Sequence, residues 1–163
     1  MEEDFLIEMD YAGLTARLKR LSDAFVYSTK EFYKSIDLDI EPNWHMIFLI
    51  LQKNERMTVM EIAEALRLSH PAIVKLINKM KKHGYIKSEI DANDARKYQL
   101  RLSEKALEKL PQLEKYWAAG NESVAEIMNH NREILKQLEM LEENITKEDF
   151  KQRTERILKT NKP

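Results

Sequence analysis

The chain has 163 residues with no cysteine, three glycines and four prolines, and its formal net charge is −1 at pH 7. The lack of cysteine excludes disulfides and cysteine-ligated metals, and the longest apolar run, residues 46–51, is far shorter than a membrane span. The acidic start lacks the basic region of a signal peptide, so we expect a cytoplasmic protein with no membrane partner.

The N-terminal third predicts two helices. Apolar residues recur at three- and four-residue steps across residues 11–37, the pattern of a long amphipathic helix. After a loop at residues 36–40, Pro42 begins a shorter helix that ends near Asn54. This second helix is apolar on most faces, so it should form the centre of the core.

A helix-turn-helix pattern follows. Thr58 and Glu61 have capping-box spacing and predict the start of a short helix. Residues 67–69 end it, with Ser69 as the N-cap of the next helix and Pro71 in that helix's first turn.

The next helix has two unlike faces. At about 100° per residue, one side is apolar, with Ile73, Leu76, Ile77 and Met80. The opposite side is polar and basic, with Pro71, Lys75, Asn78 and Lys82. An apolar floor beneath a basic, hydrogen-bonding surface is what insertion into the DNA major groove requires. Gly84 should supply the left-handed residue that ends this helix.

Residues 85–90 and 97–102 alternate apolar and polar side chains, which predicts a two-stranded hairpin with a polar tip at residues 91–96. The side chains expected to pack inward are Ile86, Ile90, Tyr98, Leu100 and Leu102. The predicted fold class is therefore mostly α, with a winged helix-turn-helix core at residues 42–102. Between Arg67 and Arg101 basic residues outnumber carboxylates, which gives this core a local positive charge on a nearly neutral chain.

The C-terminal part predicts further helices. Ser103 should begin a helix that Pro111 kinks, and Gly120-Asn121 should interrupt it. An amphipathic segment follows over residues 124–141, and Thr146 and Asp149 should cap a last helix. Residues 11–37 and 107–160 are thus predicted to be dimerisation arms of a single unit spanning residues 1–163, because their apolar stripes exceed what the core can cover.

Four segments carry a resemblance to a known family: Glu41-Pro42-Asn43-Trp44, Met60-Glu61-Ile62-Ala63, residues 68–76 and Asp91-Ala92-Asn93-Asp94-Ala95-Arg96. In these segments the chain resembles the MarR family of bacterial transcriptional regulators. The last segment fits that family's wing signature of Asp, Asp and Arg at its first, fourth and sixth positions. Two departures reduce the expected polar base contacts: Ala95 where many members carry Arg, and residues 71–74 where a run is often richer in Ser and Thr.

The predicted function is sequence-specific binding of double-stranded DNA by a homodimer, acting as a transcriptional repressor on an inverted repeat. Pro71 and Ala72 are expected at thymine methyls, Lys75 at a guanine and Asn78 at an adenine. Lys79, Lys82, Lys97 and His70 are expected at phosphates, and Asp94 should orient Arg96 for the minor groove. The predicted DNA-binding residues are Ser69, His70, Pro71, Ala72, Lys75, Asn78, Lys79, Lys82, Asp94, Arg96 and Lys97.

Other functions have weaker support in the sequence. The near-neutral charge leaves open a winged-helix module that binds protein and no DNA. No catalytic motif is present, so we expect no enzyme activity and no cofactor. The four histidines have no metal-ligand spacing, so no metal site is expected. The resemblance implies a small aromatic or phenolic effector, for which Trp44, Tyr116 and Trp117 are candidates, although these aromatics can equally fill the core.

Overall fold

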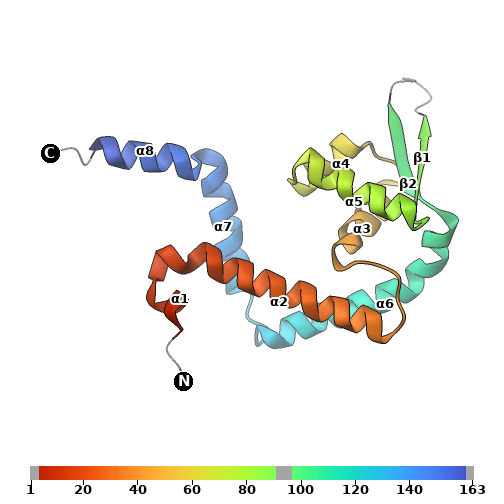
Figure 1. Ribbon diagram of the computed structural model, residues 1–163, viewed down its shortest axis with the longest axis horizontal. Helices are drawn as coiled ribbons and strands as arrows, with labels where there is room; N and C mark the ends of the chain where they lie inside the picture. Colours follow the sequence, from red (N-terminus) through yellow and green to blue (C-terminus); the bar gives the residue numbers. More distant parts are fainter. Residues whose placement is uncertain (1–3, 91–96, 161–163) are drawn as a thin grey trace. The chain divides into compact units, whose positions relative to one another are not determined.

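The computed structural model of the chain describes residues 4–90 and 97–160. Helices dominate, and the described residues hold one two-stranded antiparallel sheet, so the fold is the predicted mostly α winged helix (Figure 1). The chain divides into two compact units, Met1–Gln112 and Leu113–Pro163. Within the described ranges, no helix is both long and apolar enough to cross a membrane.

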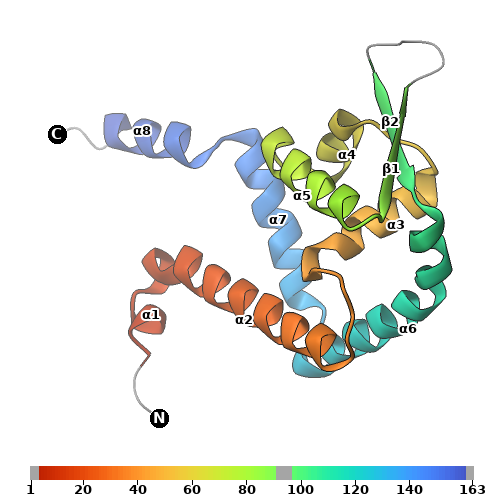
Figure 2. The same cartoon turned by 45° about the vertical axis from the view of Figure 1, so that its right-hand side comes forward.

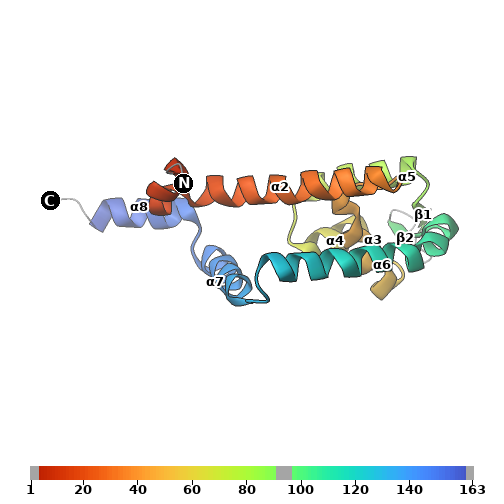
Figure 3. The same cartoon turned by 90° about the horizontal axis from the view of Figure 1, so that it is seen from below.

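The first unit begins with a short helix, α1 (Phe5–Glu8), which the sequence analysis did not predict. A 3-10 turn at Asp10–Gly13 separates it from α2 (Leu14–Ser35), the predicted amphipathic helix, which is a single uninterrupted rod in Figure 3. The Asp4 carboxylate caps α1 and accepts a hydrogen bond of 2.6 Å from Arg20, which ties α1 to α2.

The core of the first unit is built on the apolar helix predicted to begin at Pro42. A 3-10 turn at Pro42–Trp44 leads into α3 (His45–Asn54). Trp44, Ile47 and Phe48 are completely buried, which confirms the predicted central position of this helix.

The two helices of the helix-turn-helix are α4 (Val59–Leu66) and α5 (His70–Lys82). The predicted capping box is confirmed: the Glu61 carboxylate accepts from the Thr58 amide at 2.6 Å, and Thr58 Oγ1 accepts from the Glu61 amide at 3.2 Å. Ser69 occupies the predicted N-cap position of α5, but its side chain makes no capping hydrogen bond.

The hairpin consists of β1 (Ile86–Ile90) and β2 (Tyr98–Leu102), in the register that sets Ile90 opposite Tyr98. Ile86, Leu100 and Leu102 are buried as predicted, but the prediction for Ile90 and Tyr98 is wrong, since these side chains are 62% and 57% exposed. They form the last pair of the ladder, at the end of the two strands that is farther from α5 and α6, and Figure 2 shows this end of the hairpin extending past the helices.

The predicted break at Gly120-Asn121 is wrong. Helix α6 (Glu104–Ile127) continues through it and runs from the first unit into the second. A glycine inside a helix costs only about 1 kcal/mol relative to alanine, which good helix formers on both sides can offset. The chain bends instead after Ile127, where Asn129 and His130 have positive φ values.

The last two helices are α7 (Glu133–Lys147) and α8 (Phe150–Thr160). Asp149 caps α8 as predicted, because its carboxylate accepts from the Gln152 amide at 2.8 Å. The predicted capping role of Thr146 is wrong: Thr146 lies within α7, and its hydroxyl donates to the Glu142 carbonyl.

Candidate nucleic-acid interface

Helix α5 has the two faces that its sequence predicts. Ile73, Ile77 and Met80 are at most 1% exposed and fix the helix on the core of the first unit, together with Leu76. The predicted contact residues of this region all have exposed side chains, and they are Ser69, His70, Pro71, Ala72, Lys75, Asn78, Lys79 and Lys82. Lys97, directly before the second strand, is also exposed, whereas Asp94 and Arg96 lie outside the described residues.

The junction between α5 and the hairpin is fixed by backbone geometry. Gly84 has φ 77°, the left-handed conformation predicted for it. The Tyr85 amide donates to the Met80 carbonyl at 2.9 Å, and the Ser103 hydroxyl donates to the Gly84 carbonyl at 2.6 Å. Ser103 also caps α6, since its hydroxyl oxygen accepts from the Ala106 amide. The hairpin therefore leaves the end of α5 in one defined direction.

An aromatic cluster lies beneath this junction. The Tyr85 ring meets Trp44 at 5.7 Å and Phe48 at 5.6 Å between ring centroids, both edge-on. Lys105 Nζ lies 4.2 Å from the centre of the Tyr85 ring and donates to the His83 carbonyl at 2.7 Å. Burial raises the pKa of Tyr85, so its hydroxyl stays protonated at neutral pH.

The three aromatic residues predicted for an effector pocket do not share one unit. Trp44 is fully buried in the first unit, with its ring edge-on to His83 and Tyr85, whereas Tyr116 and Trp117 are half-buried in the second. Core packing accounts for Trp44, and the effector pocket stays a prediction.

Charged side chains join the base of the hairpin to its surroundings. Arg101 Nε donates to Glu89 at 2.7 Å, and Arg56 lies 3.4 Å from the other oxygen of the same carboxylate. Glu104, in the first turn of α6, pairs with Lys87 and lies 3.4 Å from Arg101. The Lys87 ammonium is the main cause that lowers the pKa of Glu104 to about 2, and Arg101 adds to it. The network connects α6 and both strands to the loop before α4.

Lys79 and His83, near the C-terminal end of α5, contact acidic residues from the loop before α3. Lys79 Nζ lies 3.0 and 3.3 Å from the two Glu41 carboxylate oxygens. His83 Nδ1 lies 3.1 Å from both oxygens of Asp39. Beside the Lys79 pair is a groove of about 300 Å³, lined by Glu41 and Asn43 from the loop side and by Ala72, Lys75 and Leu76 from α5.

Sequence reasoning missed these partners. Glu41 and Lys79 are 38 residues apart, and Asp39 and His83 are 44 apart, so no local spacing rule connects them. The sequence signal available was the alternation of acidic and apolar residues at positions 38–41, which suits an extended segment with one buried side.

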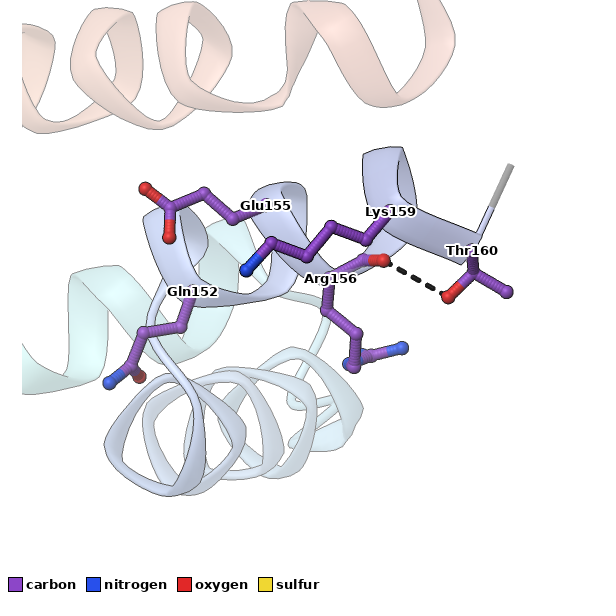
Figure 4. Close-up of a pocket in the computed structure, with 5 residues that line it drawn as sticks. All are labelled: Gln152, Glu155, Arg156, Lys159 and Thr160. Atoms are coloured by element: carbon purple, nitrogen blue, oxygen red, sulfur yellow. Dashed lines mark hydrogen bonds between the residues drawn. The ribbon is translucent and has the colours of Figure 1, made fainter. Parts of the chain in front are cut away.

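The second unit offers a shallow depression on α8, shown in Figure 4. Its lining comes from this one helix, and Arg156 there is already paired with Glu148 through contacts of 2.8 and 2.9 Å. Across residues 4–90 and 97–160, no three metal-ligating side chains come together in a way that would hold an ion.

Residues 38–97 match the sequence profile of the MarR family. The matched segment contains α3, the helix-turn-helix and the first strand of the hairpin. These residues form a MarR-family domain. No match was found among curated protein sequences.

Solved structures show the same fold. The MarR protein from Peptoclostridium difficile is 22% identical, with a TM-score of 0.71 over 93% of this chain and 99% of that one. MepR of S. aureus in complex with DNA is 15% identical, with a TM-score of 0.68 over 81% and 97%. A mutant MarR from E. coli complexed with operator DNA is 14% identical, with a TM-score of 0.65 over 88% and 99%. The MarR-type architecture thus extends over most of the chain.

Proposed function

We propose that this protein is a sequence-specific, double-stranded DNA-binding transcriptional regulator of the MarR type, which acts in the cytoplasm as a homodimeric repressor on an inverted repeat. The observation that carries the proposal is the exposed face of α5, where Lys75, Asn78 and Lys82 stand opposite a fully buried apolar face. Two proteins of the same fold were solved on DNA, which supports the same use of this surface.

The chemistry of that face suits both kinds of DNA contact. Lys75 and Asn78 can donate to base edges in the major groove, and Pro71 and Ala72 can meet thymine methyls. Lys82, Lys97 and His70 can hold phosphates, which position the protein without reading sequence. In a two-fold dimer, the two copies of α5 would lie about 34–36 Å apart, one turn of B-DNA.

Release by a small aromatic or phenolic effector is part of the proposal. It is supported by Tyr116 and Trp117, whose half-buried rings leave aromatic surface accessible in the second unit. Quenching of tryptophan fluorescence by a titrated phenol would test it, with Trp117→Phe as the variant in which the signal should be lost.

The test of DNA binding is a titration of the purified chain with bulk genomic DNA at low and at moderate salt, followed by selection of bound fragments from random DNA. Binding should weaken steeply as salt rises, because phosphate contacts release counterions, and the selected fragments should share an inverted repeat. A chain that binds no duplex even at low salt would instead be a protein-interaction module.

A further inference from the structure

The segment that connects α2 to α3 lies along the C-terminal half of α5 and presents two carboxylates to it. Glu41 contacts Lys79, and Asp39 contacts His83, one helical turn further along. Ile40, between the two acidic residues, is only 7% exposed. In Figure 2 the segment is the orange irregular stretch between the two helices. We call residues 39–41 the acidic segment.

The two contacts span one turn of α5, because Lys79 and His83 are four residues apart, about 6 Å along the helix axis. Glu41 and Asp39 reach these side chains from the acidic segment, and the buried Ile40 anchors the segment between them. The Ile40 amide donates to the Leu38 carbonyl at 3.0 Å, which turns the backbone at Asp39.

Lys79 is the cation on which this arrangement acts. It follows Lys75 by one turn of α5, so it flanks the face proposed to enter the major groove. Its ammonium reaches both oxygens of Glu41, a bidentate acceptor that resembles two oxygens of a phosphate. Lys79 is 49% exposed and Glu41 45%, so a duplex can reach the pair and replace the carboxylate.

We propose that the acidic segment is an intramolecular competitor for DNA phosphates, in which Glu41 holds Lys79 and thereby lowers the affinity of the protein for DNA. The inference rests on the proposed function. It adds Glu41 as a residue that tunes the affinity of the protein for DNA without contacting a base. Each binding event must exchange the Glu41 contact for a phosphate contact. Because exposed ion pairs are weak, the exchange is easy and the competition is modest in size.

The test uses the full chain with Glu41→Gln, which keeps the shape of the side chain and removes its charge. We expect a gain in DNA affinity of roughly two- to five-fold at low salt. The gain should shrink at high salt, where screening already weakens the ion pair. The slope of log affinity against log salt should steepen by up to about 0.9, one additional phosphate contact.

Two controls separate competition from the mere loss of a negative charge. Glu64→Gln removes an exposed carboxylate from α4 and should change affinity little. In a Lys79→Met background, Glu41→Gln should give no gain, because the cation for which Glu41 competes is gone. An equal gain with and without Lys79, or no gain in the wild-type background, would overturn the inference.

Failure of the inference is distinguishable from failure of the proposed function. A wild-type chain that binds no duplex at low salt contradicts the function itself. A wild-type chain that binds DNA and is unaffected by Glu41→Gln contradicts only the competitor. Thermal melts of all variants check that the fold is retained, which the half-exposed positions of both side chains favour.

Discussion

At the scale of single residues, Lys75 is the side chain of α5 on which base selection should depend most. It is exposed in the middle of the proposed contact face, and its ammonium can donate to a guanine edge. Lys75→Ala should cost about 1–3 kcal/mol on the best operator and relax preference at one base pair. The measurement is the affinity of wild type and variant for a panel of operators that each carry one base change.

Lys82→Ala is the matched control and should weaken binding to all operators alike. If Lys75→Ala and Lys82→Ala changed the affinities across the panel in the same way, Lys75 would not be the residue that reads a base.

Glu104 makes a prediction about pH. Its pKa is lowered from 4.5 to about 2 by Lys87 and, in part, by Arg101. A group whose pKa is lower in the folded state stabilises the fold above its unfolded pKa, and this contribution is lost as pH falls through the folded value. The difference in unfolding free energy between wild type and Glu104→Gln should therefore be present at neutral pH and disappear between about pH 4.5 and pH 2.

Denaturant unfolding over that pH range provides the measurement. Glu108→Gln serves as the reference, because Glu108 is exposed one turn along α6 and makes no comparable ion pair within residues 4–90 and 97–160. If both variants followed wild type at every pH, the charge network at the base of the hairpin would contribute nothing to stability.

At the scale of elements, two glycines should respond to alanine with opposite signs. Gly84 needs its left-handed φ of 77°, and an added Cβ would meet nothing closer than a Lys105 carbon at 3.8 Å, so its cost is conformational. Gly84→Ala should destabilise the protein by about 1–2 kcal/mol. Gly120 lies within α6 with open space around it, so Gly120→Ala should stabilise by about 0.5–1 kcal/mol. Thermal or chemical unfolding of the two variants measures the change in unfolding free energy. A change of the same sign in both variants would contradict the prediction.

Elements defined by local rules were predictable from sequence. The capping box of Thr58 and Glu61, the two faces of α5 and the turn at Gly84 each depend on residues within one or two helical turns. The exposed Ile90 and Tyr98 were not predictable, because alternation defines the two faces of a strand but not how far the core extends along it. The continuity of α6 through Gly120 likewise depends on its whole context rather than on the glycine.

The candidate site was predictable only in part, for the same reason. Exposure of the α5 contact residues follows from helical periodicity. The pairing of Lys79 with Glu41, and of Arg101 with Glu89, depends on the tertiary path of the chain and on which loop passes beside which helix. Long charged side chains satisfy many geometries, so sequence spacing alone cannot choose among partners.

At the scale of the whole molecule, exposed apolar surface supports the proposed homodimer. In the first unit, α2 exposes Leu21 and Val26 by about half. In the second, Leu135 is 47% and Leu158 65% exposed. Along α2, exposed apolar side chains recur at three- and four-residue steps from Leu14 to Phe25, and an apolar stripe of this kind marks an association surface.

Sedimentation at micromolar concentration should therefore return twice the mass of the chain. Leu135→Lys should shift the mass toward that of a monomer, while Glu139→Lys, which changes charge on the same helix without removing an apolar side chain, should not. A monomeric wild type would contradict the dimer.

The hydrogen bonds at the junction between α5 and the hairpin also bear on local unfolding of this part of the protein. The Tyr85 amide donates to Met80 and the Ser103 amide donates to Tyr85, so the fully buried Tyr85 is bonded both to the end of α5 and to the residue before α6. These amides should exchange at one common rate and act as a single cooperative unit. Exposed positions at the far end of the hairpin, such as Ile90 and Tyr98, should exchange earlier in a deuterium time course. The hairpin can then fray at its far end while its direction relative to α5 is preserved.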